Sequence, residues 1–346
     1  MNLKYSFIYI GLSLFLLLFG FLAGIHFAPQ LTPPPSWQVS AAWPVPQVVQ
    51  KVSPKVVTVS VLSKESSGHP DIEVSAGSGF IYPPNYILTN YHVVGKAKRA
   101  QITYADGRKE LGKVIGHDFE TDVAVIKVKE VNTTPLTLGD SSRLQVGELV
   151  LTVGSPQHLE RTVTSGIISA LNRTLSTGAR TFVGLIQTDA PINFGSSGGP
   201  LINLRGEVIG VNTLIGGGDN SQGIAFALPI NQVKEVANRL IAGQKVEHAF
   251  AGLTFADLNE RQAEKAGLKA GLGALIVHVA PGTPAFYAGL KKGDIVVAAN
   301  GQQIKDSNAI IGVIRGSKVG AVLKVKVKRG SKLFTKFLKL VTKPQP

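Results

Sequence analysis

Short runs of β-branched and aromatic residues dominate the chain between residues 47 and 230. Turns rich in Gly, Pro, Asp and Asn separate these runs, and the clearest are 56–61, 79–82, 123–128, 148–153, 163–168 and 207–212. Short strands at this spacing are typical of an all-β sandwich or barrel. A helix is indicated only at 230–242, where an apolar face recurs with helical spacing and Gly243 follows as a stop signal. The pattern predicts a mainly β domain that ends with one helix.

The last hundred residues have a different pattern. Residues 250–255 indicate a glycine-containing loop that runs into a strand, and 275–279 indicates another strand. Residues 288–296 then indicate a short helix, a turn and a strand. A second helix is expected at 307–316, before a basic hairpin. We therefore expect one domain at 47–245 and a small α+β domain at 246–346.

The N-terminus carries a long apolar run. Residues 7–28 contain no Asp, Glu, Lys or Arg, and Lys4 precedes them. About 20 apolar residues are enough to cross a bilayer, and the preceding lysine favours export of everything that follows. A cleavable signal peptide is the alternative, but its apolar core normally has only about 7–15 residues. We expect an uncleaved anchor at 1–28 and a proline-rich linker at 29–46.

The net charge of +14 is concentrated in the C-terminal part. Residues 246–346 hold 16 Lys and Arg against 6 Asp and Glu, a balance of +10. Many of these lysines alternate with apolar residues between 322 and 339, and this alternation predicts two strands with one solvent-exposed face. Lysines that protect an exposed sheet edge are the favoured interpretation. Attraction to an anionic membrane or an acidic peptide is the alternative, and no nucleic-acid partner is expected.

Candidate chemistry first appears in the run Gly195-Ser196-Ser197-Gly198-Gly199-Pro200. Glycine permits backbone angles that a Cβ forbids, so such a loop can bring amides together around one hydroxyl. The amides of Gly195 and Ser197 could both face the oxygen of a carbonyl under attack by Ser197, as an oxyanion hole. Alone the signal is weak, since Gly/Ser turns are common.

A base and a carboxylate precede this loop in a compatible order. His92 follows an apolar strand, and Asp122 directly precedes a strand that reads as buried. A buried carboxylate needs a hydrogen-bonding partner, and a histidine ring N–H provides one. The order His92, Asp122, Ser197 is that of chymotrypsin-like proteases. We predict Ser197 as nucleophile, His92 as base and Asp122 as the group that orients the base.

Other hydrolase classes fit less well. The serine loop also matches the G-x-S-x-G elbow of α/β-hydrolases, but residues 200–208 indicate a hairpin where that fold requires a helix. No H-E-x-x-H motif is present, so a zinc protease is excluded. The chain has no cysteine, which excludes disulfides, thiolate metal sites and a cysteine nucleophile. We expect no metal and no cofactor.

Several motifs together resemble the HtrA (Deg) family of serine proteases. They are 77–80, 88–94, 121–127, 138–141, 162–170 and 187–190. The resemblance covers 47–346 and implies a chymotrypsin-like double β-barrel followed by a small α+β PDZ domain. An anchor, a short loop at 63–75 and a single PDZ domain are similar to the DegS subgroup.

That subgroup implies a biological setting. Its members are homotrimeric stress sensors in the bacterial inner membrane, single-pass, with both folded domains in the periplasm. They cleave a membrane-bound anti-sigma factor after the PDZ domain binds exposed C-terminal peptides of misfolded proteins. We therefore expect a regulated serine endopeptidase of envelope protein quality control.

The resemblance also implies binding residues. Asn193 and the strand Ile224-Ala225-Phe226 are expected to pair with substrate and line a modest apolar pocket. The loop Phe250-Ala251-Gly252-Leu253 is expected to cap a peptide carboxylate while the peptide adds a strand. Arg180 is a candidate activation-loop contact, with a solvated surface arginine as the alternative.

Two departures from the family pattern bear on activity. Phe194 stands where the family usually has proline, and Ser196 where it usually has asparagine. Both flank the glycine whose amide would form the oxyanion hole. The alternative function is therefore a catalytically silent chaperone or binding protein that keeps the barrel and uses its PDZ domain.

Overall fold

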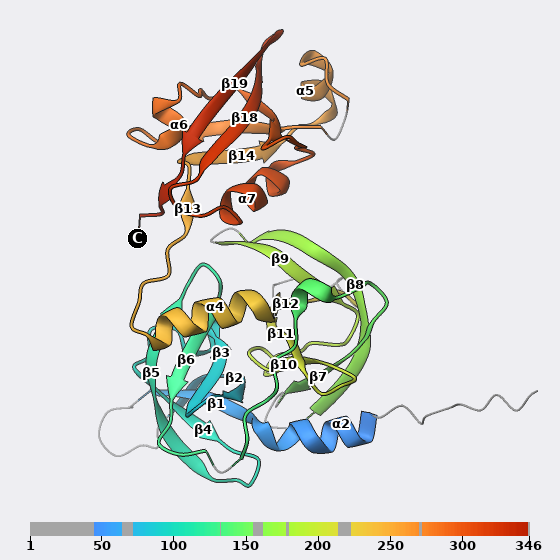
Figure 1. Cartoon of the computed structure of the whole chain (residues 1–346), viewed down its shortest axis with the longest axis vertical. Coiled ribbons are helices and arrows are strands. Elements are labelled where there is room, and N and C mark those ends of the chain that lie inside the picture. The colour runs from blue at the N-terminus through green and yellow to red at the C-terminus, as the bar shows by residue number, and fades with distance from the viewer. Residues whose placement is uncertain are drawn as a thin grey trace, which may run out of the picture. The chain divides into compact units, whose positions relative to one another are not determined.

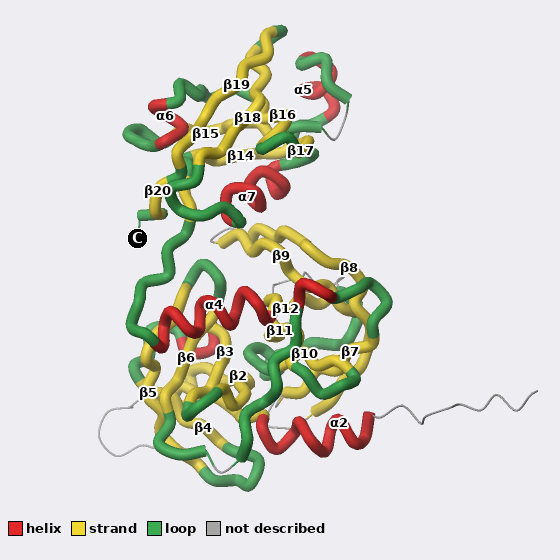
Figure 2. Tube along the Cα trace, in the orientation of Figure 1, coloured by secondary structure: helices red, strands yellow, loops and turns green. Residues whose placement is uncertain are grey.

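The computed structural model describes residues 45–63, 72–131, 133–154, 162–177, 180–213, 223–269 and 272–344. Strands are the main element, as Figure 2 shows in yellow. The first six form a closed barrel in the order β1-β2-β3-β6-β5-β4 (Figure 1). Their bounds are β1 Val56–Ser63, β2 Ile72–Tyr82, β3 Tyr86–Asn90, β4 Arg99–Thr103, β5 Lys109–Asp118 and β6 Val123–Lys127.

A second closed barrel follows, in the order β10-β11-β12-β9-β8-β7. Its strands are β7 Leu149–Gly154, β8 Thr162–Thr177, β9 Arg180–Thr188, β10 Pro200–Asn203, β11 Val208–Thr213 and β12 Ala225–Pro229. Each barrel has its own interior, and a third apolar cluster contains buried residues of both barrels, for example Phe80, Val123, Leu151 and Val208. This shared core joins the two barrels.

Helices cover the shared core. Helix α4 (Ile230–Ile241) buries Val233, Val236 and Leu240 against it, and the turn after the helix contains Gly243 at φ 69°. The helix predicted at 230–242 is therefore confirmed. Helix α2 (Val45–Val52) packs Val48 and Val52 on the same cluster and leads into a 3₁₀ turn at Ser53–Lys55. A further 3₁₀ turn spans Ser141–Arg143.

One helix was not expected from the pattern. His92 was placed at the end of a strand, but it lies in the one-turn helix α3 (Tyr91–Val94), directly after β3. Four residues are too few to give a helical period, so the sequence offered no signal. The turn buries Val93 and Val94 in the first barrel and leaves His92 partly exposed.

The C-terminal part forms an α+β domain. Its sheet has the order β14-β15-β16-β18-β19, with β17 paired to β16, and β13 pairs separately with β20. The strands are β13 Ala249–Phe250, β14 Leu253–Asp257, β15 Ala274–Val279, β16 Ile295–Ala299, β17 Gln302–Gln303, β18 Val322–Arg329, β19 Lys332–Lys339 and β20 Val341–Thr342. The helices are α5 Glu260–Lys265, α6 Pro284–Tyr287 and α7 Ser307–Arg315. The expected fold class, a mainly β double barrel with a small α+β domain, is confirmed.

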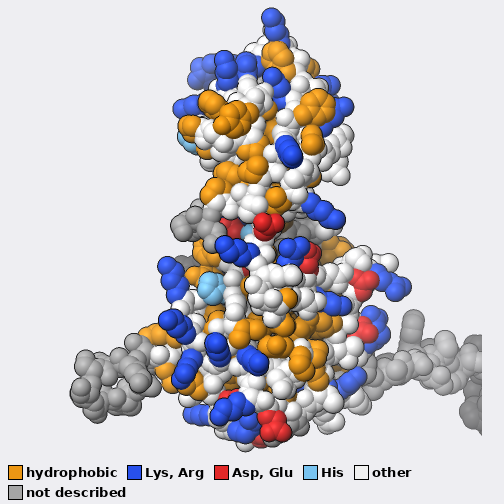
Figure 3. Space-filling model, turned by 60° about the vertical axis from the view of Figure 1, so that its left-hand side comes forward, with side chains coloured by type: hydrophobic (Ala, Val, Ile, Leu, Met, Phe, Trp, Pro, Cys, Tyr) orange, Lys and Arg blue, Asp and Glu red, His pale blue; other side chains and the backbone are white. Residues whose placement is uncertain are grey.

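Strand β18 of the basic hairpin β18–β19 has the predicted alternation, whereas β19 does not. Leu323, Val325 and Val327 are buried in the domain core, whereas Lys324 and Lys326 between them are exposed. Lys and Arg side chains far outnumber acidic ones on the face that Figure 3 shows. The exposed face of β18 is therefore cationic, whereas β19 exposes Leu333 and Phe337 beside these lysines.

The expected location in a membrane is not upheld. Within the ranges that the structure describes, no helix combines the length and the apolar character needed to cross a bilayer. This finding contradicts the expected assignment as a single-pass inner-membrane protein. The apolar run at 7–28, on which that expectation depended, lies outside the described residues, as do the linker up to residue 44 and residues 64–71 of the expected short loop.

Candidate active site

The serine loop between β9 and β10 consists of two successive tight turns. The Ser196 N–H donates to the Asn193 carbonyl at 2.9 Å, and the Gly199 N–H donates to the Ser196 carbonyl at 3.0 Å. The third positions of these turns are Gly195 and Gly198, at φ 93° and 83°. A type II turn needs positive φ at its third residue, which explains both glycines. Ser197 occupies the second position of the second turn and is only 4% exposed.

Strands from both barrels hold this loop. From β2, the Ser78 amide donates to the Ser197 carbonyl at 2.8 Å and the Ser78 hydroxyl to the Gly195 carbonyl at 2.5 Å. From β11, the Asn212 carbonyl accepts from the Gly198 N–H at 2.8 Å. A Cβ on Gly198 would lie 2.2 Å from the Ser78 carbonyl oxygen. Only glycine fits at position 198. The contacts with β2 and β11 therefore fix the loop between the two barrels.

His92 and Asp122 are joined by two hydrogen bonds. The ring Nδ1 of His92 lies 2.7 Å from Oδ2 of Asp122, and the backbone N–H of His92 donates to Oδ1 at 3.0 Å. Asp122 is fully buried, and its backbone has φ 60°, a left-handed conformation that Asp tolerates better than most residues. Its carbonyl accepts from the Tyr91 N–H at 3.0 Å. Main chain and side chain together therefore fix the histidine relative to the carboxylate.

Two further side chains reach the same carboxylate. The Thr213 hydroxyl at the end of β11 donates to Oδ2 at 3.0 Å, and the Arg180 guanidinium at the start of β9 donates to Oδ1 at 2.8 Å. Burial alone raises the pKa of Asp122, but the hydrogen bond and charge of His92, with the charge of Arg180, outweigh it. The pKa of Asp122 lies below its ordinary value, so the group is a carboxylate at neutral pH.

The serine loop and α3 meet at one glycine of β2. A Cβ on Gly77 would lie 2.6 Å from the Val93 side chain and 2.9 Å from the Ser197 carbonyl oxygen. Val93 follows His92 directly, so the backbones that carry His92 and Ser197 approach each other across Gly77. The three residues predicted as nucleophile, base and orienting group thus lie together between the two barrels.

The residues expected to bind substrate lie on the second barrel. Ile224 is 52% exposed directly before β12, Ala225 stands opposite Thr188 of β9, and Phe226 packs partly on the shared core. Asn193 is exposed and begins the first turn of the serine loop. The role of these positions in substrate binding remains a prediction.

The loop expected to cap a peptide carboxylate precedes β14. Gly252 has φ 81°, and a Cβ there would lie 2.1 Å from the Thr283 hydroxyl oxygen. The Ala251 carbonyl accepts from the Ala285 N–H at 3.0 Å, and the Gly252 carbonyl from the Ala280 N–H at 2.9 Å. These contacts fix the loop against the start of α6. Only a residue without a Cβ fits at position 252.

Sequence reasoning missed Thr213 and Ser78. Thr213 is 91 residues from Asp122, and Ser78 is 117 residues from Gly195. A Ser or Thr inside a strand has no local pattern that separates a structural hydroxyl from one at a site. Arg180 was considered only as a candidate loop contact, and nothing in its neighbours indicated the pairing with Asp122.

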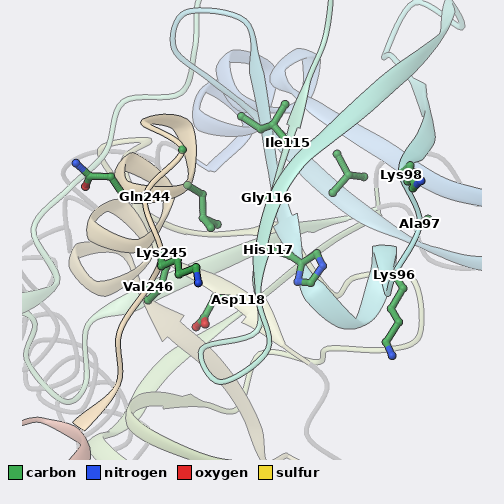
Figure 4. A pocket seen from close by; sticks show the side chains of 13 residues that line it. Lys96, Ala97, Lys98, Ile115, Gly116, His117, Asp118, Gln244, Lys245 and Val246 are labelled. Atoms are coloured by element: carbon green, nitrogen blue, oxygen red, sulfur yellow. The ribbon is translucent and has the colours of Figure 1, made fainter. Parts of the chain in front are cut away.

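A cavity of about 420 Å³ lies beside β5, and Figure 4 shows its lining. His117 and Asp118 project from opposite sides of the strand, as successive strand residues do. The Asp118 carboxylate lies 2.9 Å from the Nε2 atom of His248. Among the described residues, no cluster of three or more His, Asp or Glu side chains could hold a metal ion.

Comparisons with known proteins agree with this geometry. Residues 77–211 match the trypsin-like peptidase domain family, and residues 249–340 match the PDZ domain family. The putative serine protease HhoB of Synechocystis sp. is 39% identical over 83% of this chain and 76% of its own length. The serine protease Do-like HtrA of Bacillus subtilis is 35% identical over 87% of this chain and 73% of its own length.

Solved structures give the same result. The HtrA-type protease AlgW with a decapeptide superposes with a TM-score of 0.72 at 30% identity, over 88% of this chain and all of that one. Fold and site thus define a trypsin-like serine endopeptidase followed by one PDZ domain. The chain belongs to the HtrA family of serine proteases.

Proposed function

We propose that Ser197 is the nucleophile of this protease, His92 its general base and Asp122 the group that orients the base. The observation that carries the proposal is the buried Asp122 carboxylate, hydrogen-bonded to both the ring and the backbone of His92. A serine hydroxyl is a weak nucleophile until a base removes its proton. His92 takes this proton as Ser197 attacks the peptide carbonyl, and returns it to the leaving amine. Water then hydrolyses the acyl-enzyme by the same route.

The amides of Gly195 and Ser197 form the oxyanion hole in this proposal. Positive φ at Gly195 supports it, because a type II turn sets the direction of the peptide between Phe194 and Gly195. The Ser78 hydroxyl, bound to the Gly195 carbonyl, supports a single orientation of the next peptide. Removal of one oxyanion donor typically costs about 10²–10³ in kcat. The residues Phe194 and Ser196 remove neither donor, because both donors are backbone N–H groups.

Substrate binds along β12 in the same proposal. Ile224 is exposed directly before β12, where Ala225 pairs with Thr188 of β9 and Phe226 pairs with both β9 and β11. An extended peptide that pairs with a strand presents alternate side chains to pockets. A modest apolar side chain is the expected preference at the cleaved position.

The PDZ domain receives C-terminal peptides. β14 is at one end of its sheet, so one side of this strand has no strand partner among the described residues. The loop 250–253 leads into β14, and α7 contacts the same strand. A peptide added beside β14 would place its carboxylate at the amides of this loop. The bound decapeptide of AlgW belongs to that protein and gives the model for the proposal.

Peptide binding regulates the protease domain in this proposal. Arg315 at the end of α7 lies 2.6 Å from Glu120, and Lys343 also pairs with Glu120. Glu120 is two residues before Asp122, so it connects the peptide-binding domain with the turn that carries the orienting carboxylate. We place the enzyme in envelope stress sensing, as a DegS-like homotrimer that cleaves an anti-sigma-factor-like or unfolded protein.

Proteolysis of an unfolded protein tests the proposal. Wild type should cleave it, Ser197→Ala should not, and a C-terminal peptide should raise the rate. Gly252→Ala should abolish this stimulation, because its Cβ would collide with Thr283. Gly282→Ala is the matched control, since Gly282 also has positive φ but has open space around it. Equal, negligible cleavage by wild type and Ser197→Ala, with and without peptide, would favour the silent binding protein.

A further inference from the structure

The Arg180 guanidinium, which donates to Asp122, is also held by contacts with two aromatic residues. Its guanidinium lies over the rings of Phe119 and Phe182, with centroid distances of 4.8 and 5.1 Å. It also donates to the Phe119 carbonyl at 3.1 Å, and its side chain is 16% exposed. Aromatic faces attract a guanidinium and restrict its orientation. Arg180 is therefore a preorganised donor, unlike a solvated surface arginine.

The guanidinium and the imidazole contact different oxygens of Asp122. Arg180 donates to Oδ1 at 2.8 Å, whereas the His92 ring is 2.7 Å from Oδ2. The carboxylate is fully buried, so water does not compete for either oxygen. A carboxylate held at one oxygen by a fixed donor cannot rotate freely, and its other oxygen keeps one direction toward the ring.

Other charged groups near Asp122 are occupied elsewhere. Glu120 pairs with Arg315 and Lys343, and Asp118 pairs with His248. The His117 ring on β5 lies tilted against the Tyr91 ring, with the centroids 4.8 Å apart, and Thr213 of β11 is neutral. Among the described residues, the ionisable side chains hydrogen-bonded to Asp122 are therefore His92 and Arg180.

We infer that Arg180 is a positioning residue of the protease, which acts through Asp122 to set the orientation and the protonation of the Asp122–His92 pair. The inference rests on the proposed roles of His92 and Asp122. It gives Arg180 a part in the chemical step itself, which a contact that only orders an activation loop does not have.

The charge of Arg180 has a consequence that orientation alone lacks. A fixed positive charge opposes the uptake of a proton by the neighbouring pair, because the protonated pair carries one more positive charge. Loss of this charge makes protonation easier. The pair must be unprotonated at the histidine to act as a base, so activity would then be lost at a higher pH.

Kinetics of Arg180→Gln and Arg180→Lys test the inference. Arg180→Gln should lower kcat by about 10- to 100-fold, the range for a lost charged hydrogen bond. The acid limb of its kcat/KM profile should move to a higher pH than that of wild type. Arg180→Lys keeps the charge and should keep the wild-type limb, with a partial recovery of kcat. Arg205→Gln removes a surface charge whose ion-pair partner among the described residues is Glu207, and it is the control for net charge.

The outcomes separate the two proposals. Activity that survives Ser197→Ala removes the proposed nucleophile and, with it, the basis of this inference. An active wild type whose Arg180→Gln variant keeps the same kcat and acid limb overturns the role of Arg180 alone. Arg180 has a structural role only if Arg180→Gln and Arg180→Lys have equally low kcat values and the acid limb of Arg180→Gln coincides with that of wild type. Thermal unfolding of each variant identifies any that fails to fold, and if Arg180→Gln does not fold, the neutral variant Arg180→Met takes its place in the same comparison.

Discussion

At Asp122, a left-handed backbone and a buried carboxylate occur in one residue, and four donors reach the two carboxylate oxygens. They are the backbone and ring of His92, the Arg180 guanidinium and the Thr213 hydroxyl. A buried charge is tolerated only when hydrogen bonds replace its hydration. Each donor therefore supports both the fold and the direction of the carboxylate.

Replacement of Thr213 by valine tests one of these donors. The hydroxyl is buried, and its loss leaves Oδ2 with the imidazole as its only donor among the described groups. A hydrogen bond to a charged group is worth about 1.5–3 kcal/mol. We expect kcat/KM to fall by about 10-fold or more in Thr213→Val and to stay near wild type in Thr213→Ser. If both variants keep the kcat/KM of wild type, this hydroxyl is dispensable.

At the scale of elements, the turn between β5 and β6 carries the acidic groups of the site. Asp118 at its start accepts from the Thr121 N–H at 2.8 Å and hydroxyl at 2.5 Å, and lies 2.9 Å from His248 Nε2. Burial raises the pKa of Asp118, but the bonds from His248 and Thr121 outweigh it, so the pKa lies below its ordinary value. These contacts fix the turn that ends in Asp122.

This turn predicts an acid-sensitive contribution to stability. Because the folded pKa of Asp118 is lowered, its contribution is fully present above the unfolded value of about 3.9 and is lost as the pH falls through the folded pKa. Urea unfolding between pH 6 and pH 3 measures it. Asp118→Asn should be less stable than wild type at pH 6 by about 1–3 kcal/mol, and the difference should shrink below pH 4. A difference that stays constant over this range would contradict the assignment.

Elements with a strong period were the ones that the sequence could predict. The alternation in β18 and the helical face of α4 both depend on which residues are buried, and burial follows from apolar spacing. The one-turn helix α3 was missed because four residues define no period. Short elements at a site are set by tertiary contacts, such as the hydrogen bond from the Tyr91 amide to the Asp122 carbonyl.

At the scale of the whole molecule, family motifs predicted two domains and the residues of the site, and the barrels bring these residues together. The contacts that join distant segments could not be predicted. Arg180 is 58 residues from Asp122, and His248 is 130 residues from Asp118. Such pairs depend on how strands pack, which no local pattern encodes. The inner-membrane assignment relied on the apolar run at 7–28, on Lys4 and on the resemblance to the DegS subgroup, and it is contradicted because no helix in the described part of the chain is long and apolar enough to cross a membrane.

The most direct test of the account maps the reactive serine. A fluorophosphonate probe reacts with a serine that a neighbouring base has activated. After labelling with and without a C-terminal peptide, mass spectrometry can distinguish Ser196 from Ser197. We predict label on Ser197 in the wild type and in Ser196→Ala, and none in Ser197→Ala or His92→Ala. Label on Ser196, or no label on an enzyme that cleaves protein, would contradict the central claim.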